Sequence, residues 1–349
     1  MRQWSRPAAG WRRIACAHLW AAALVLVWPA TVLHAQPSAI EANSRALQRA
    51  SDSVLGVEVQ ALEGARSAAT LGSQRSGSGV VIGTDGLVLT IGYLVLEADD
   101  VLLLPDDGRR VPARVVAYDV ATGFGLVQAL TPLNIEPVPL GRARALVPEE
   151  PLAFVSGGAQ GLVSTVRLLE RKPFSGNWEY HLEEALYTAP ARRDQSGAGL
   201  FNARGELVGI GSLFLAQAAA AGAGRQPGNV FVPAELLEPI LGELRSRGHS
   251  AASLRPWLGI QCQETPGGLR IVRVNDDSPA DVAGLQAGDT IERIDGVEVR
   301  ALASLWQTLW RTGPPEREVV LEVLREGTRQ TLKVYSVDRM KTLKRAQGV

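Results

Sequence analysis

Short apolar runs, separated by turn residues, dominate the first part of the chain. Valine, leucine and isoleucine are concentrated in these runs, and glycine, aspartate and proline stand between them. The runs cover residues 54–59, 78–82, 86–90, 100–104 and 114–118. Regularly spaced runs of this kind are typical of strands in an antiparallel barrel or sandwich. The pattern therefore predicts a mainly β fold.

Four segments depart from this strand pattern. Residues 36–49 are polar and rich in alanine, serine and glutamate, which indicates a linker or a short helix. Alanine and glycine over residues 217–228 favour a flexible surface loop. Residues 233–247 carry apolar side chains at helical spacing, so we expect a helix there. Residues 248–253 would then be an inter-domain linker.

The N-terminus has the features of a secretory signal peptide. Four arginines precede an apolar run from Leu19 to Leu33, and the segment ends at Ala35. We expect cleavage after Ala35 and export of the chain. The alternative is an uncleaved anchor, because the bulky Leu33 weakens the small-x-small cleavage pattern. No later apolar stretch approaches about 18 residues, so we expect no membrane span after cleavage.

Charge, cysteine content and length narrow the class of protein. The chain has 36 basic and 36 acidic residues, and removing the four N-terminal arginines leaves 32 basic ones. Because these form no basic cluster, we expect no nucleic-acid partner. Cys262 is the one cysteine after Ala35, so no internal disulfide can form. The roughly 310 residues that follow Ala35 exceed what one core usually supports, which favours two domains.

Several short segments, most of them rich in glycine, stand out along the chain. One of them, Gln195–Leu200, holds Ser196 between small residues. The others cover residues 77–82, 85–90, 107–109, 205–210 and 228–233. In sequence and order these segments resemble the HtrA/Deg family of periplasmic trypsin-like proteases, and the resemblance extends from Val54 to Val337. It implies a periplasmic, mainly β chain with a trypsin-like double β-barrel followed by a PDZ domain, without cofactor or metal.

The same resemblance shows which catalytic groups are missing. Ser196 stands at the nucleophile position, but Tyr93 replaces the general-base histidine and Gly123 replaces the orienting aspartate. Asp194 replaces a glycine whose amide helps to bind the oxyanion, and its carboxylate opposes the developing charge. A serine hydroxyl needs a base to take its proton, and tyrosine, with a reference pKa of about 10, is protonated at neutral pH. We therefore expect an inactive protease domain.

Each of these residues also has a purely structural interpretation. Ser196 fits a glycine-rich turn as a small polar residue, and Tyr93 fills the space that an imidazole would take. Asp194 could pair with Arg192 or Arg193, or its charge could be solvated. The segment that leads to Ser196 is also one residue shorter than in the family, so its conformation is open.

An enzymatic alternative rests on the remaining histidines. After Ala35 the chain has two, His181 and His249, and neither lies at the position of the general base. His181 precedes Ser196 by about 15 residues and could be recruited as a non-standard base. In that case the chain would be a serine endopeptidase that uses Ser196.

The C-terminal part contains a second specific match. Residues 277–291 resemble the PDZ signature, and residues 303–310 are expected to form the helix beside its groove. A PDZ domain adds an extended peptide to a sheet edge, while loop amides receive its terminal carboxylate. The resemblance places peptide-binding residues at Trp257, Leu258, Gly259, Ile260, Cys262 and Trp306. The alternative is a PDZ fold that only docks onto the barrel.

These observations predict a signal peptide (1–35), a linker (36–50), a trypsin-like domain (51–248), a PDZ domain (254–338) and a C-terminal tail (339–349). The predicted function is binding of protein or peptide C-termini, or of unfolded segments, in an adaptor, chaperone-like or regulatory role. Further partners to consider are an active HtrA homologue and other copies of the chain.

Overall fold

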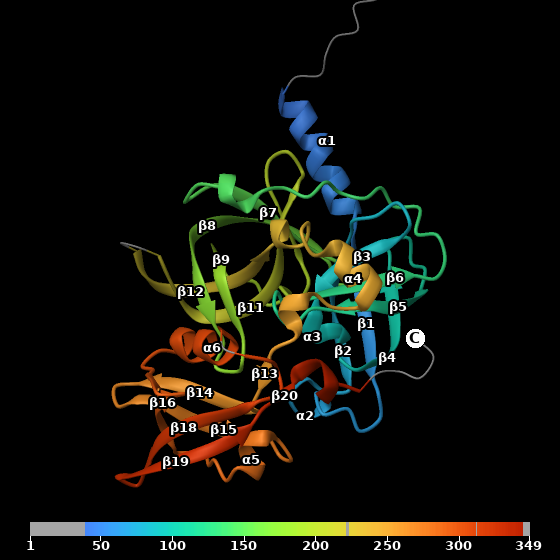
Figure 1. Ribbon diagram of the computed structural model, residues 1–349. Coiled ribbons are helices and arrows are strands. Elements are labelled where there is room, and N and C mark those ends of the chain that lie inside the picture. Colours follow the sequence, from blue (N-terminus) through green and yellow to red (C-terminus); the bar gives the residue numbers. More distant parts are fainter. Residues whose placement is uncertain (1–38, 221–222, 312, 345–349) are drawn as a thin grey trace, which may run out of the picture. The chain divides into compact units, whose positions relative to one another are not determined.

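The computed structural model describes residues 39–220, 223–311 and 313–344 (Figure 1). The chain from Ala39 onward forms one compact unit. The predicted signal peptide, residues 1–35, lies outside the described residues. Within the described part, no helix combines the length and the apolar character needed to cross a membrane.

The first barrel is closed by six strands in the order β1-β2-β3-β6-β5-β4 (Figure 1). These strands are β1 (Val54–Ala61), β2 (Gln74–Val81), β3 (Leu87–Ile91), β4 (Ala98–Leu104), β5 (Val111–Tyr118) and β6 (Phe124–Ala129). Each apolar run predicted from the sequence overlaps one of them. Leu55, Leu89 and Leu103 are fully buried, as expected where alternate residues of a strand point into a barrel.

The second barrel follows directly and is closed in the order β10-β11-β12-β9-β8-β7. Its strands are β7 (Pro151–Ser156), β8 (Leu162–Ser175), β9 (His181–Ala189), β10 (Gly199–Phe201), β11 (Leu207–Ala220) and β12 (Ala223–Pro233). Phe154 and Phe231 pack edge to face in its core, with ring centroids 6.2 Å apart. Two consecutive closed barrels confirm the predicted mainly β, double-barrel fold.

Short helices connect and flank the barrels. They are α1 (Ala39–Asp52), α2 (Ala68–Leu71), α3 (Gly92–Val95), η1 (Ala143–Ala145), η2 (Ala234–Leu236) and α4 (Leu241–Arg247). The short helix considered for residues 36–49 is present as α1. A continuous helix over residues 233–247 was the wrong prediction, because Pro239 lacks an N–H and its ring clashes with the preceding turn. The segment divides into η2 and α4 on either side of it.

The expected surface loop at residues 217–228 is instead the end of a hairpin. β11 pairs with β12 up to Ala220 opposite Ala223, with several register shifts. The prediction was wrong because ladder pairing uses the backbone, which alanine and glycine also supply. Because alanine and glycine have only a weak preference for strands, the sequence did not indicate this pairing.

The C-terminal part forms its own sheet and core. Strands β14 (Ile260–Thr265), β15 (Gly268–Val274), β16 (Thr290–Ile294), β18 (Glu318–Arg325) and β19 (Thr328–Tyr335) lie in this order, with β17 (Val297–Glu298) paired to β16. A second, two-stranded sheet joins β13 (Pro256–Trp257) to β20 (Val337–Asp338). Two α-helices, α5 (Pro279–Val282) and α6 (Leu302–Arg311), complete it, and η4 (Arg339–Thr342) follows β20. Trp306 on α6 is fully buried in this core, and α6 confirms the predicted helix.

The segment expected to be an inter-domain linker is packed against the first barrel. It contains η3 (Ala251–Ser253). The buried carboxylate of Asp119 accepts hydrogen bonds from Ser250 N–H at 3.0 Å and from Ser253 Oγ at 2.5 Å. Two anchors on one buried carboxylate fix this segment, so it is not a free tether.

Candidate active site and peptide groove

Ser196 lies on a tight turn between β9 and β10. Ala198 N–H donates to the Gln195 carbonyl at 3.1 Å, and Gly197 has a φ of +73°. A Cβ on Gly197 would lie 2.0 Å from the Ser78 carbonyl oxygen, so only glycine fits here. The Ser196 carbonyl accepts from Ser78 N–H at 2.8 Å. The turn thus holds the half-buried Ser196 in one orientation.

Tyr93 faces Ser196, in agreement with its predicted position. It lies on α3, directly after β3, and its Oη is 2.8 Å from Ser196 Oγ and 2.8 Å from the Ser212 carbonyl oxygen. Burial raises the pKa of Tyr93 to about 12, although the hydrogen bond with Ser196 lowers it. The phenol is therefore neutral over the physiological range and does not take a proton from the serine.

Gly123 leaves no room for an orienting carboxylate. Its φ is +81°, and its carbonyl accepts from Gly92 N–H at 2.7 Å. A Cβ at this position would lie 2.9 Å from Tyr180 Oη, which donates to the Thr122 carbonyl at 2.7 Å. The aromatic ring of Tyr180 therefore lies against the place where a longer side chain would start.

Asp119, the nearby carboxylate, has a structural role. Besides the contacts with Ser250 and Ser253, it accepts from Thr122 N–H at 2.9 Å and Thr122 Oγ1 at 2.7 Å. Burial opposes its ionisation, but these hydrogen bonds hold the pKa of Asp119 below its ordinary value. These contacts hold the Thr122 turn and the 250–253 segment in place.

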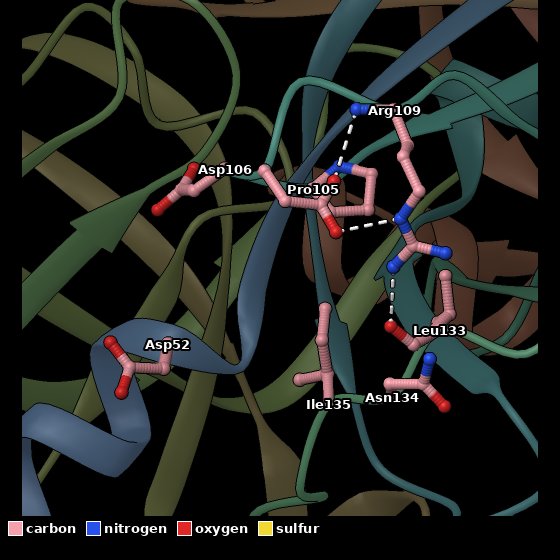
Figure 2. Close-up of a pocket in the computed structure, with 8 residues that line it drawn as sticks. Asp52, Pro105, Asp106, Arg109, Leu133, Asn134 and Ile135 are labelled. Atoms are coloured by element: carbon pink, nitrogen blue, oxygen red, sulfur yellow. Dashed lines mark hydrogen bonds and ion pairs between the residues drawn. The ribbon is translucent and has the colours of Figure 1, made fainter.

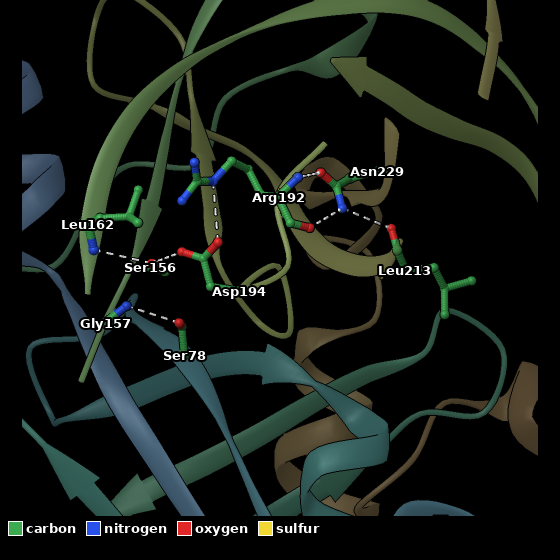
Figure 3. Close-up of polar contacts among 8 residues, drawn as sticks. All are labelled: Ser78, Ser156, Gly157, Leu162, Arg192, Asp194, Leu213 and Asn229. Carbon is green, nitrogen blue, oxygen red and sulfur yellow. Dashed lines mark hydrogen bonds and ion pairs between the residues drawn. The ribbon is translucent and has the colours of Figure 1, made fainter. Parts of the chain in front are cut away.

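Asp194 is held beside the Ser196 turn by side chains of the second barrel (Figure 3). Its carboxylate accepts from Ser156 Oγ at 2.5 Å and pairs with Arg192 Nε at 3.3 Å. Asn229 fixes the backbone of Arg192 from both sides, accepting from its N–H at 2.6 Å and donating to its carbonyl at 2.8 Å. The predicted ion pair with Arg192 is present, whereas Arg193 lies over the ring of Phe214.

The two described histidines contact other residues than Ser196. The ring of His181 lies 2.8 Å from Ser175 Oγ through Nδ1 and 3.2 Å from Gln307 Nε2 through Nε2. His249 Nδ1 lies 3.0 Å from the Ser250 carbonyl oxygen. The structure thus gives no support for recruitment of His181 as a base.

A separate surface pocket of about 450 Å³ opens between α1 and the 105–109 turn (Figure 2). Arg109 spans it, donating to Asp107 and to the Leu133 carbonyl at 2.7 Å. None of the predicted site residues lines this pocket. Among the described residues, no three His, Cys, Asp or Glu side chains are grouped so that they could hold a metal ion.

The predicted peptide-binding residues do come together, and they contact a segment of the same chain. The Glu179 carboxylate accepts hydrogen bonds from the backbone amides of Leu258, Gly259 and Ile260. The distances from these nitrogens to Glu179 Oε1 are 2.8–3.2 Å. Cys262 N–H donates to the Asn177 carbonyl at 2.7 Å.

The two predicted tryptophans make different contacts. Trp306 Nε1 donates to the Gly176 carbonyl at 3.0 Å. Trp257 lies in β13, and its ring packs under the Arg339 guanidinium, with Cζ 4.7 Å from the ring centroid. Glu179 was missed from the sequence, since a single glutamate between two aromatic residues carries no recognisable signal.

Comparisons with known proteins agree with this architecture. The family described as "Trypsin-like peptidase domain" matches residues 77–210, and the family described as "PDZ domain" matches residues 256–335. The chain thus contains a trypsin-like peptidase domain followed by a PDZ domain, in the order that its motifs predicted.

Relatives at the sequence level are named probable periplasmic serine endoprotease DegP-like. The protein from Ectopseudomonas mendocina (strain ymp) is 28% identical over 281 residues, which cover 75% of this chain and 56% of the relative. The protein from Halomonas elongata is 27% identical over 293 residues, 78% of this chain and 58% of the relative. The chain thus spans less than two thirds of the length of these relatives.

Solved structures share the fold. The HtrA-type protease AlgW with decapeptide has a TM-score of 0.53 and 21% identity, over 85% of this chain and 98% of that chain. The serine endoprotease from Yersinia pestis has a TM-score of 0.51 and 20% identity, over 85% of this chain and 97% of that one.

Proposed function

We propose that the chain is a periplasmic HtrA-type protein that binds peptide C-termini or unfolded segments through its PDZ groove and does not cleave them. The observation that carries this proposal is the position of Tyr93 Oη, 2.8 Å from Ser196 Oγ, where the family has an imidazole. We further propose that residues 51–248 act as an inactive protease domain and residues 254–338 as the binding domain.

The chemistry of Ser196 supports this reading. Its hydroxyl becomes nucleophilic only when a neighbouring group accepts its proton. Tyr93 stays protonated because burial raises its pKa to about 12, and no carboxylate stands at Gly123. Loss of members of a catalytic triad lowers turnover by roughly 10³ to 10⁶. Asp194 stands where the family has a glycine whose amide helps to bind the oxyanion, and its carboxylate is held by Ser156 and Arg192.

The groove supports peptide binding. Three consecutive amides converge on one carboxylate, and Gly259, with a φ of +87°, gives the loop the conformation that this convergence needs. Such an amide cluster is suited to the terminal carboxylate of a peptide added along β14. The structure of AlgW named with a decapeptide is consistent with a peptide ligand for this chain.

A second candidate function is serine endopeptidase activity. It is favoured by the names of the relatives, which are serine endoproteases, and by the match of a trypsin-like peptidase family over residues that include Ser196. Under this reading Ser196 would act with a base that the family pattern does not contain.

Labelling with a fluorophosphonate probe separates the two functions. The probe forms a covalent bond only with an activated serine, so the wild-type chain is expected to stay unlabelled under conditions that label trypsin fully. Ser196→Ala is the matched control. Labelling that disappears in Ser196→Ala would favour the endopeptidase and contradict the proposal.

We also propose that binding takes place in an assembly, either with further copies of this chain or with an active homologue. Trypsin-like domains of two chains could then share one client. Light scattering of the purified chain, alone and mixed with an active HtrA-type protease, tests this. A monomer under both conditions would contradict it.

A further inference from the structure

The groove of the PDZ sheet is already filled by the segment Gly176–Glu179, which connects β8 to β9. This internal segment runs along β14 as a peptide ligand would. Cys262 N–H donates to the Asn177 carbonyl at 2.7 Å, and Trp178 forms an antiparallel bridge with Gln261. Addition of a strand to a sheet edge is how this type of groove binds its ligands.

Glu179 takes the place that a terminal carboxylate would occupy. Its Oε1 accepts from Leu258, Gly259 and Ile260 N–H at 3.1, 2.8 and 3.2 Å. The side chain is almost completely buried, with 9% of its surface exposed. Burying a carboxyl group costs less where donors surround it, and here the donors are the amides that a peptide terminus would use.

Aromatic contacts hold the internal segment on the second barrel. Trp178 and Tyr180 stack with ring centroids 5.8 Å apart, and Phe174 packs against both rings. Tyr180 Oη donates to the Thr122 carbonyl in the turn that contains Gly123. Both ends of the internal segment are therefore held in the groove, and the neighbouring Tyr180 is held on the Thr122 turn of the first barrel.

We propose that Gly176–Glu179 is an internal ligand of the PDZ groove, and that an external C-terminal peptide binds by displacing it. This inference rests on the proposed peptide-binding function and adds its regulation. A tethered ligand competes at an effective concentration in the millimolar range for short tethers. The affinity for an external peptide is reduced by the fraction of chains in which the groove is closed.

The test uses the full chain and fluorescein-labelled decapeptides that end in Val, Leu, Ile or Phe with a free carboxylate. Glu179→Ala removes the internal carboxylate and should raise peptide affinity at least tenfold over wild type. Glu184→Ala is the matched control, because Glu184 lies on β9, shortly after the internal segment, and pairs with Arg171. Glu179→Gln, which keeps the size of the side chain, should give an intermediate gain.

Hydrogen exchange of the Leu258, Gly259 and Ile260 amides is the second readout. These amides should be protected in the wild-type chain and in Glu184→Ala, and should exchange faster in Glu179→Ala while the β18 amides stay protected. Equal peptide affinity in wild type and Glu179→Ala, or unprotected amides in the wild type, would overturn the inference. If no decapeptide binds even Glu179→Ala, the proposed peptide-binding function fails, whereas the exchange data still report on the internal contact.

Discussion

Tyr93 holds Ser196 through its phenol hydroxyl. Its hydroxyl contacts both Ser196 Oγ and the Ser212 carbonyl oxygen, which connects α3 of the first barrel to β11 of the second. A hydrogen bond of this kind contributes about 1 kcal/mol net, and an unsatisfied buried partner costs more. The hydroxyl of Tyr93 therefore contributes to the contact between the two barrels at Ser196.

Replacing Tyr93 by Phe should destabilise the chain by about 1 kcal/mol, because the Ser212 carbonyl loses its donor. It should give no protease activity. The free energy of unfolding in urea measures the first effect, and Tyr335→Phe is the control, since Tyr335 is 65% exposed. An unchanged stability in Tyr93→Phe would mean that the two contacts contribute nothing.

Restoring the family residues at two positions should not restore catalysis. In Tyr93→His with Gly123→Asp, the aspartate would start from a φ of +81° with its Cβ 2.9 Å from Tyr180 Oη. Backbone strain alone costs about 1–3 kcal/mol at such a position. Adding Asp194→Gly should help more than its single effect, since these residues act as a unit. Full casein cleavage by the first pair alone would contradict this account.

Glu179 should make peptide binding depend on pH. Burial raises the pKa of its carboxyl from 4.5 to about 7, against the opposing effect of the three loop amides and Arg339. Between these pKa values, Glu179 is protonated when it lies in the groove and ionised when it is exposed to water. The internal contact therefore weakens as pH rises from about 4.5 to about 7. The nearby thiol of Cys262 stays neutral there, because burial raises its pKa.

Peptide affinity of the wild-type chain should accordingly increase between pH 5 and pH 8, as about 4.5 to about 7 is the window in which Glu179 loses its proton. Glu179→Gln should show a flatter profile. Fluorescence polarisation over this range measures the peptide affinity of both chains. The histidines and the peptide carboxylate are the same in the two experiments, so only Glu179 differs. Identical profiles would refute the role of Glu179.

At the scale of elements, glycine is required in the Gln195–Ala198 turn but not in helix α4. Gly197→Ala should destabilise the chain by more than about 1 kcal/mol, because the φ is +73° and the Cβ would meet the Ser78 carbonyl at 2.0 Å. Gly242→Ala in α4 meets no atom within 4 Å and should stabilise it by about 0.5–1 kcal/mol. Urea unfolding compares the two, and a similar effect of both variants would contradict the turn geometry.

In the loop before β14 whose amides contact Glu179, Gly259→Val is an unsuitable test of peptide binding. A Val at Gly259 would block the approach of a carboxylate to the loop amides. In the structure a Cβ there would lie 2.3 Å from Ser278 Cβ, and Ser278 is fully buried. The substitution would disturb the packing of α5 as well as the groove, so Glu179 is the better position to test.

Over the whole molecule, the sequence predicted what depends on local pattern. Apolar runs predicted five strands of the first barrel, β1 to β5, and the order of the motifs predicted two barrels followed by a PDZ domain. The position of Tyr93 against Ser196 followed from the same motifs. What could not be predicted depends on contacts between distant residues: the filling of the space beside Gly123 by Tyr180, the anchoring of residues 250–253 on Asp119, and the Glu179 carboxylate in the groove.

Cleavage of casein by the full-length chain tests the central claim most directly. It should be measured for wild type, Glu179→Ala and Ser196→Ala, each with and without a saturating decapeptide, so that an occupied groove cannot hide activity. We expect no cleavage above the buffer background in any sample, because Ser196 faces a protonated phenol rather than a base. Cleavage by wild type or Glu179→Ala that Ser196→Ala abolishes would contradict the account and establish a serine endopeptidase.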